Sequence, residues 1–450
     1  MQKLLEWVDD RFPLIKTWEE HLAKYYAPKN FNFWYYFGSL ALLVLVIQIV
    51  SGIFLTMHYK PDAGLAFASV EYIMRDVSWG WLIRYMHSTG ASFFFIMVYL
   101  HMFRALLYGS YRGPRELLWI IGMVLFIALM AEAFMGYLLP WGNMSYWGAQ
   151  VIISVFSAIP LIGDGLAEWL RGDFVVSDAT LNRFFAFHVI ALPLILVALV
   201  FVHIVALHKV GSNNPDGIDI KKNKGPDGNP ADGIPFHPYY TVKDIVGAVV
   251  FLMAFSAVVF FAPEMGGWFL EHDNFAPANI LQTPPEIVPL WYFTPFYSIL
   301  RATTERIMPV LSVMVALLGL LSVFTVRGVV AKSVTIAIAA VLVIGLYTME
   351  AKLWGVILMG ASLVLFFFLP WLDRSPVKSI RYRGWMYKTA LTIFVISFVV
   401  LGYLGTQPAD GPKVVMAQVG MVLYLLFFLL MPWYSKYDRT KPEPDRVTMK

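Results

Sequence analysis

The chain has 450 residues, of which 59% are hydrophobic and 14% charged, and its formal net charge at pH 7 is +4. Soluble domains contain about 25% charged residues, so this composition excludes an ordinary soluble protein. The small, dispersed positive charge gives no support for nucleic-acid binding. The sequence has no cysteine, which excludes disulfides, thiolate catalysis and cysteine-ligated iron–sulfur clusters. A redox cofactor therefore needs histidine, methionine or carboxylate ligands, or belongs to another subunit.

Apolar segments of about 20 residues, long enough to cross a bilayer, predict an all-α polytopic membrane protein. The first 18 residues are too polar for a signal peptide and predict an amphipathic surface helix. Ten candidate spans follow, at 34–57, 81–103, 116–139, 184–207, 245–262, 307–326, 333–349, 353–371, 389–406 and 414–433. With a cytoplasmic N-terminus, 25 of the 34 Lys and Arg residues lie on the cytoplasmic side and 9 on the outer side, as the positive-inside rule requires.

Two long outer connections, 140–180 and 263–300, are rich in Gly, Pro and aromatic residues. We expect short interfacial helices there and expect the two segments together to roof a cavity; the alternative is that they are only long loops. The polar segment 211–242 predicts a cytoplasmic linker between an N-terminal unit, 1–210, and a C-terminal unit, 243–450.

Four histidines lie inside apolar spans and form two pairs, His87 with His101 and His188 with His203. An ionisable residue within the bilayer is expensive and indicates function. In a helix, 14 positions return to within about 40° of the same face, about 21 Å along the axis. Because both spans run from the outer side to the cytoplasm, His87 and His188 share an outer level, and His101 and His203 an inner one. This geometry predicts a four-helix bundle that encloses two non-covalent b-type haems, each with two axial histidines.

Glycines on the first and third spans repeat this spacing: Gly38, Gly52, Gly122 and Gly136. Close helix packing through small residues is one explanation; the other is that each porphyrin edge requires a missing side chain. Three arginines, Arg84, Arg104 and Arg183, lie near the histidines. They could snorkel to the interface, but we favour a role in neutralising haem propionates.

With these features the chain resembles cytochrome b of the quinol:cytochrome c reductase (cytochrome bc) complex, over nearly its whole length. Besides the His and Gly spacing, the likeness rests on PWGNMSYWGA at 140–149, HKVGSNNP at 208–215, FHPYYTVKD at 236–244 and TPP…WYF at 283–293. The resemblance implies two quinone sites on opposite sides, a homodimer, bound lipids, and a bacterial inner-membrane location. It also implies a Rieske iron–sulfur protein and a membrane-anchored c-type cytochrome as partners, with ubiquinone as the quinone.

Matched by position, the resemblance places six residues at the outer quinol-oxidation site: Phe134, Tyr137, Trp147, Gly148, Tyr292 and Tyr297. It places four at the inner quinone-reduction site: His208, Ser212, Lys243 and Asp244. Quinone reduction consumes two protons, so an acid–base cluster five residues beyond a haem ligand is chemically apt. The alternative for the inner cluster is that these are interfacial polar residues.

The chain departs from the family pattern in three ways. The second histidine pair is spaced by 15 residues rather than 14, which predicts a kink or wide turn near Pro193. Leu290 stands where the family has an acid, and we hypothesise that Glu286 replaces it as proton acceptor; a solvated loop glutamate is the alternative. Residues 305–350 look inserted and predict an extra transmembrane hairpin with its turn, 327–332, on the cytoplasmic side.

We therefore expect the dihaem electron-transfer core of an oxidoreductase that oxidises quinol outside and reduces quinone near the cytoplasm, coupled to proton translocation. A dihaem membrane anchor of another quinone-linked dehydrogenase is the first alternative, but it would lack the paired glycines and broken outer loops. A transporter with a histidine proton relay is the second, and haem absorbance would exclude it.

Overall fold

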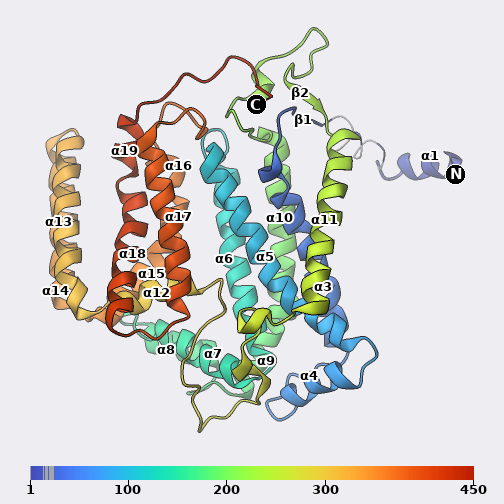
Figure 1. Ribbon diagram of the computed structural model, residues 1–450, viewed down its shortest axis with the longest axis vertical. Helices are drawn as coiled ribbons and strands as arrows, with labels where there is room; N and C mark the ends of the chain where they lie inside the picture. Colours follow the sequence, from blue (N-terminus) through green and yellow to red (C-terminus); the bar gives the residue numbers. More distant parts are fainter. Residues whose placement is uncertain (1, 14, 16–18, 20–24, 450) are drawn as a thin grey trace.

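The computed structural model describes residues 2–13, 15, 19 and 25–449. Long helices stand side by side in it (Figure 1). Among the described residues, nine helical segments are long and apolar enough to cross a membrane. In the structure's labels they are α3 (Phe37–Thr56), α5 (Gly80–Tyr108), α6 (Glu116–Leu138), the continuous run α9 (Asp178–Ala186), η3 (Phe187–Ala191) and α10 (Leu192–Val210), then α11 (Tyr239–Phe261), α13 (Met308–Thr325), α14 (Val329–Thr348), α17 (Trp385–Gly405) and α18 (Gly411–Leu429).

The tenth predicted span corresponds to α15 (Ala351–Phe367), an apolar helix of 17 residues. It continues into the short α16 (Leu369–Leu372). All ten predicted spans therefore have a helix in the structure, so the prediction of a polytopic all-α membrane protein is confirmed. The helix ends differ most at α5, which runs five residues further than expected, and at α11 and the α9–α10 run, which each begin six residues earlier.

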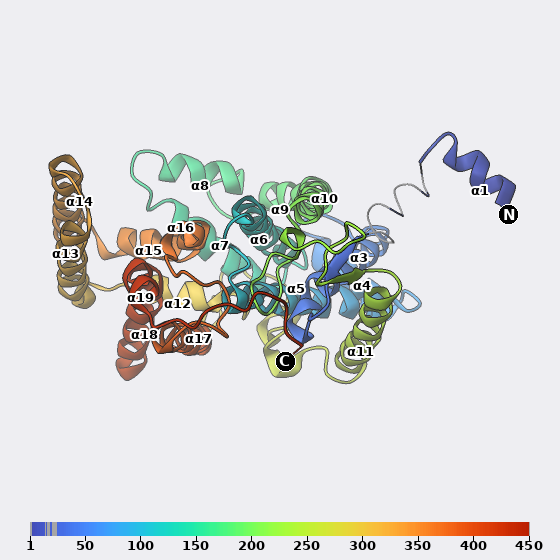
Figure 2. The same cartoon turned by 90° about the horizontal axis from the view of Figure 1, so that it is seen from above.

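Helices α3, α5, α6 and α10 form the N-terminal bundle: α3 packs along α5, and α6 along α10. Seen from above, the four gather around one centre (Figure 2). The connections leave the bundle at two opposite ends (Figure 1). We call the end with residues 211–238 the linker face, and the end with residues 139–177 and 262–293 the loop face.

The loop face is built as expected from short helices and a broken loop. It contains α4 (Ala66–Arg75), α7 (Asn143–Phe156), α8 (Gly163–Arg171), η5 (Met265–Gly267) and η6 (His272–Phe275). The two long connections are joined by hydrogen bonds: the Asn143 amide donates to the Ala276 carbonyl at 2.9 Å, and the Ala278 amide to the Trp141 carbonyl at 2.9 Å. Together they cover the end of the bundle, so the predicted joint roof is present.

The linker face is held together by backbone pairing and by the ion pairs of Asp232 with Lys29 and Arg446. Strand β1 (Tyr26–Pro28) pairs antiparallel with β2 (Gly233–Pro235). The short helices on this face and at the chain ends are α1 (Gln2–Asp9), η2 (Phe33–Tyr35), η4 (Ile220–Lys222) and α19 (Met431–Tyr437). The α1 helix covers only part of the amphipathic segment expected at residues 1–18, several of which lie outside the described residues.

A wide turn solves the spacing problem of the second histidine pair. The segment η3 (Phe187–Ala191) is a π-helix: the Leu192 amide donates to the carbonyl of Phe187, five residues earlier. A π-turn accommodates one residue more than an α-turn, so it takes up the fifteenth residue between His188 and His203. The wide turn predicted near Pro193 is confirmed.

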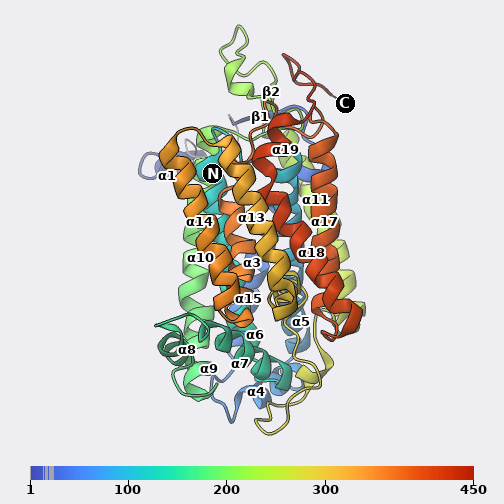
Figure 3. The ribbon, with the colours of Figure 1, turned by 90° about the vertical axis from the view of Figure 1, so that its left-hand side faces the viewer.

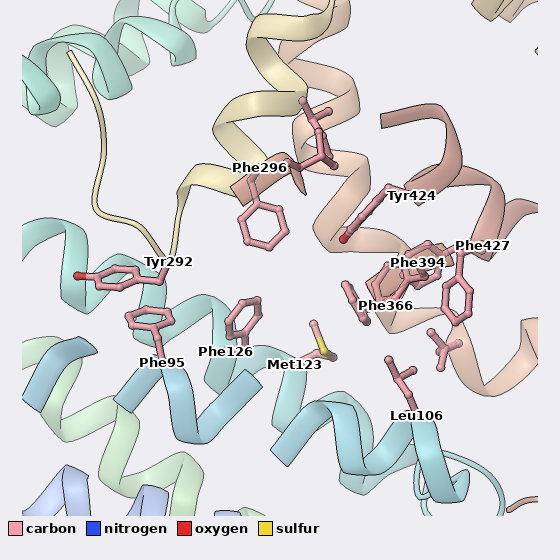
Figure 4. Close-up of a cluster of buried hydrophobic side chains, with 14 of the residues drawn as sticks. Phe95, Leu106, Met123, Phe126, Tyr292, Phe296, Phe366, Phe394, Tyr424 and Phe427 are labelled. Atoms are coloured by element: carbon pink, nitrogen blue, oxygen red, sulfur yellow. The ribbon is translucent and has the colours of Figure 1, made fainter. Parts of the chain in front are cut away.

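The hydrophobic core is shared by both halves of the chain. One large cluster runs from α5 and α6 to α12 (Thr294–Ala302), α15, α17 and α18. Figure 4 shows Tyr292 over Phe95, with Phe126 and Met123 leading toward Phe366. The Tyr292 and Phe95 rings stack with centroids 3.9 Å apart and an angle of 6° between their planes. The segment that follows the roof is therefore anchored directly on α5.

Helices α13 and α14 form a hairpin at the edge of the molecule (Figure 1), and they face the viewer side by side in Figure 3. Its turn, near Arg327, lies at the same end as the linker face (Figure 1). The segment 305–350 therefore contains two antiparallel helices and returns the chain to α15 with the direction of the later spans unchanged.

Candidate functional site

The four buried histidines meet in two pairs inside the N-terminal bundle. The ring centroids of His87 and His188 are 6.1 Å apart, and those of His101 and His203 are 6.4 Å apart. The first pair lies toward the loop face and the second toward the linker face, as the spacing along the helices predicts.

These separations fit one iron between each pair of rings. An imidazole nitrogen lies about 2 Å from a first-row metal ion and its ring centre about 1 Å further, so two rings on opposite sides of one metal have centres about 6 Å apart. Among the described residues, no group of three His, Cys, Asp or Glu side chains is arranged to hold a metal ion. Two imidazoles at each level thus suit a cofactor that brings its own equatorial ligands, such as haem.

Each predicted glycine lies against one of these rings. A Cβ atom on Gly52 would come within 3.2 Å of His87 Cε1, and one on Gly122 within 3.2 Å of His203 Cε1. A Cβ on Gly38 would lie 3.1 Å from His101 Cε1, and one on Gly136 would overlap the His188 ring. The glycines therefore make room for the imidazoles as well as for a flat group between them.

The Nδ1 atoms of the four rings have different surroundings. His87 Nδ1 lies 2.9 Å from Ser51 Oγ. His188 Nδ1 lies 2.9 Å from the backbone carbonyl of Glu132 and 3.1 Å from its Oε1. His101 Nδ1 lies 3.3 Å from an Arg104 nitrogen, whereas His203 Nδ1 is buried without a hydrogen-bond partner. The outer pair therefore has oxygen acceptors at both rings, and the inner pair has none.

A cavity, which we call the outer cavity, extends from the pair His87 and His188 to the segments that form the loop face. Besides His87, His188, Gly52 and Gly136, it is lined by Arg84, Glu132, Tyr137, Phe269, Leu270, Asn274, Leu290 and Tyr292. Tyr137 and Tyr292 thus reach the cavity as the resemblance implies. Leu290 lines the wall with an apolar side chain, where the family has an acid.

Several residues expected at the outer site do not line this cavity. Phe134 packs on Phe184 and Trp147 donates to the Asn279 carbonyl, both in a neighbouring hydrophobic cluster. A Cβ atom placed on Gly148 would lie 3.7 Å from the Tyr137 ring. The Tyr297 hydroxyl donates to the Ile287 carbonyl at 3.2 Å. These four residues therefore lie outside the lining of the cavity.

Two further expectations need correction. The Arg183 side chain is exposed and donates to the backbone carbonyl of Trp169 in α8, so it braces the roof and does not reach the outer cavity. Glu286 is exposed on the loop face and does not line the cavity. The three prolines around it, Pro284, Pro285 and Pro289, do not fold its side chain back toward Leu290.

Glu271, which was not expected from the sequence, lies next to the outer cavity without lining it. Its neighbours Leu270 and Asn274 line the cavity, and its Oε2 accepts a hydrogen bond from the Tyr137 hydroxyl at 3.0 Å. Burial raises the pKa of Glu271 to about 7. Nothing in the local sequence EHDNF distinguishes it from its exposed neighbours.

An inner cavity joins the second histidine pair to the linker face. It is lined by His101, His203, Gly38, Gly122 and Arg104, and also by His208, Ser212, Lys243 and Asp244. The His208 ring stacks on Tyr25 with centroids 4.6 Å apart, and the Tyr25 hydroxyl lies 3.2 Å from Ser212 Oγ. All residues expected at the inner site are thus brought together.

Arg115 and Tyr25 also line the inner cavity and were not expected there. The buried Arg115 side chain donates to the carbonyls of Gly211 at 2.8 Å and Ser212 at 3.3 Å. The sequence could have indicated Arg115, because it lies at the end of an apolar span, as Arg84 and Arg104 do. Glu132 was a stronger candidate, since it is an acid inside an apolar span.

Comparisons with known proteins agree with this geometry. The family described as Cytochrome b/b6/petB matches residues 22–211, and the family described as Cytochrome b(C-terminal)/b6/petD matches residues 277–348 and 342–428. Cytochrome b of Allochromatium vinosum is 59% identical over 99% of this chain and 98% of its own length. Cytochrome b of Triticum aestivum is 42% identical over 96% of this chain and 93% of its own.

A solved structure described as "Hyperthermophilic respiratory Complex III" superimposes with a TM-score of 0.79 at 35% identity. The match covers 96% of this chain and 98% of that one. Because both the sequence and the fold match over nearly their whole length, the chain belongs to the cytochrome b family.

Proposed function

We propose that this chain is the dihaem electron-transfer core of a quinol:cytochrome c oxidoreductase, with quinol oxidised at the outer cavity and quinone reduced at the inner one. The observation that supports this best is the stacking of two facing histidine pairs, each opposite two glycines, between one cavity under the loop face and another that opens toward the linker face.

His87 and His188 would hold one b-type haem, and His101 and His203 a second. Such groups supply reversible one-electron transfer between the two cavities. The helices hold the two imidazoles of each pair at the separation that ligation of one iron requires. The four glycines leave space beside these rings that a larger side chain would fill. Arg84 and Arg104, which line the two cavities, would neutralise the haem propionates.

At the outer cavity, the aromatic and aliphatic wall binds the apolar ring and tail of a quinol. Tyr292 is fixed by its stacking on Phe95 and by the 2.5 Å hydrogen bond from the Tyr99 hydroxyl to its carbonyl. Tyr137 lines the cavity from α6, and its hydroxyl donates to Glu271 Oε2 at 3.0 Å. This wall orients the quinol and keeps bulk water away from it.

At the inner cavity, His208, Lys243 and Asp244 would bind the quinone oxygens and deliver the two protons that quinone reduction consumes. The Lys243 Nζ lies 4.6 Å from the Tyr239 ring centre, and Lys243 lines the cavity. Ser212 and Tyr25 supply hydroxyl groups near the His208 ring. Proton release at the loop face and uptake at the linker face would then translocate charge across the membrane.

The remaining parts of the complex belong to partners. Since this chain has no cysteine, a Rieske iron–sulfur protein would take one electron from quinol at the loop face and pass it to a membrane-anchored c-type cytochrome. We further propose a homodimer of the complex surrounded by lipid, in a bacterial inner membrane with the linker face cytoplasmic, and ubiquinone as the quinone.

Redox difference spectroscopy of the purified complex tests the haem assignment. We expect two b-type haems per chain and no covalent haem. Replacement His101→Leu should remove the haem near the linker face and leave the other, whereas His188→Leu should do the reverse. A protein that keeps both haem signals after either change would contradict the pairing.

A further inference from the structure

The wall of the outer cavity contains a single acid among its described lining residues, Glu132, and that carboxyl lies against His188. The family's acid position is occupied by Leu290, which is buried. Quinol oxidation releases two protons, and an apolar cavity needs a fixed group to accept the first of them.

Glu271 is connected to the cavity through Tyr137. The Tyr137 hydroxyl donates to Glu271 Oε2 at 3.0 Å, and Tyr137 itself lines the cavity one residue after Gly136. A Cβ on Gly148 would lie 3.7 Å from the Tyr137 ring, so α7 supports the ring from its other side. The pair therefore bridges the cavity wall and the roof.

The electrostatic surroundings of Glu271 suit a proton acceptor. Burial raises the pKa of Glu271 to about 7, the Tyr137 hydroxyl opposes this shift, and Asp273 in the same loop adds to it. Tyr292 is the other titratable group whose charge interacts with Glu271. A base with a pKa close to the working pH is both ionised often enough and basic enough to be efficient.

The route outward from Glu271 is short. Glu271 is a residue of intermediate exposure, and the next residues, His272 and Asp273, are exposed on the loop face. A proton taken at Glu271 can therefore leave to water without crossing the apolar roof. The exposed Glu286 could release a proton to water, but it does not line the cavity.

We propose that Glu271 accepts a proton of quinol through Tyr137 and so replaces the acid that Leu290 has displaced. This rests on the function proposed above. One quinol O–H bond breaks, its proton moves to the Tyr137 oxygen, and the Tyr137 proton moves to the Glu271 carboxylate. The two electrons would leave to the acceptors proposed above: one to the iron–sulfur partner, which would also take the second proton, and one to the haem that His87 and His188 would hold. Glu271 then releases its proton at the loop face.

Steady-state quinol:cytochrome c reduction by the purified complex, measured between about pH 5.5 and 9 at saturating quinol, tests this role. In the unmodified protein the rate should rise as the pH passes about 7, because Glu271 must be ionised to accept a proton. Glu271→Gln should lower kcat on the order of 100-fold and abolish this rise, while KM for quinol stays the same. Glu271→Asp should recover part of the rate.

The matched control is Glu168→Gln, which removes an exposed carboxylate from α8 on the same face and should change nothing. A gain-of-function variant keeps the test independent of folding: adding Leu290→Glu to Glu271→Gln should restore the rate and a pH-dependent rise. Haem spectra and quinone reduction at the inner cavity, recorded on each variant, confirm that the protein is assembled.

Full activity with an unchanged pH profile in Glu271→Gln would overturn the proposal, and so would a loss confined to Glu286→Gln. If the unmodified complex shows no haem and no quinol oxidation, the function proposed above fails instead. The two failures are therefore distinguishable.

Discussion

The side chain of Glu132 lies against the ring of His188, with Oε1 3.1 Å from Nδ1 and the backbone carbonyl of the same residue at 2.9 Å. Its second carboxyl oxygen is buried without a hydrogen-bond partner. No other histidine of the two pairs has a carboxylate at Nδ1. This asymmetry distinguishes the outer level from the inner one.

A carboxylate that accepts the Nδ1 hydrogen makes the imidazole a stronger donor to a metal and favours the oxidised iron. We therefore expect Glu132→Gln to raise the midpoint potential of the outer haem and leave the inner haem unchanged. The backbone carbonyl remains in the variant, so the ring keeps its orientation. Potentiometric titration of the haem bands measures this, with Glu116→Gln at the other end of α6 as control. An unshifted outer haem in a protein that retains both haems would contradict it.

The glycines make a graded steric prediction. In Gly136→Ala the new methyl group overlaps the His188 ring, whereas in Gly122→Ala it approaches His203 Cε1 at 3.2 Å. We expect the first variant to lose the outer haem and the second to retain the inner haem with a shifted spectrum. Gly360→Ala, where no atom lies within 4 Å of the new methyl group, is the control and should bind both haems. Equal haem content in all three would refute the steric role.

Much of the fold follows from periodicity alone. Apolar length predicts the ten spans, and the histidine and glycine spacing predicts which residues share a level. Even the wide turn at η3 follows from one surplus residue, because an α-helix cannot present His188 and His203 to the same partner helices at a separation of 15.

The loop residues could not be placed in this way. Periodicity says nothing about a broken loop, so only closeness to Leu290 along the chain favoured Glu286. The structure instead brings Glu271 to Tyr137 by folding residues 262–293 over α6 and α7. Arg183 was misplaced for a related reason: α9 begins at Asp178 and turns that side chain toward α8.

The hairpin of α13 and α14 gives a prediction about topology. Because the chain has no cysteine, a single introduced cysteine can be labelled selectively. We expect Arg327→Cys, in the turn between α13 and α14, to react with a membrane-impermeant thiol reagent from the same side as Asn223→Cys in the linker. Leu161→Cys, exposed on the loop face, should react from the opposite side. Labelling of Arg327→Cys together with Leu161→Cys would show that the hairpin does not cross the membrane.

A buried ion pair on the linker side gives the last prediction. Asp373 lies between Arg383, whose side chain is completely buried, and the Tyr111 hydroxyl, which donates to it at 2.7 Å. Removing one partner of a buried pair leaves an uncompensated charge and costs about 3–5 kcal/mol. Asp373→Asn should therefore lower the temperature at which the detergent-solubilised protein unfolds.

The matched control is Asp410→Asn, which breaks the exposed pair of Asp410 with Lys413 and should cost about 0–1 kcal/mol. Neither residue lines the outer or the inner cavity, so the haem spectrum at low temperature should be unchanged in both variants. Loss of haem absorbance on heating then reports stability alone. Equal unfolding temperatures for Asp373→Asn and Asp410→Asn would mean that Arg383 finds water or another acceptor once Asp373 is neutral, and that this charge cluster does not stabilise the junction of the two halves.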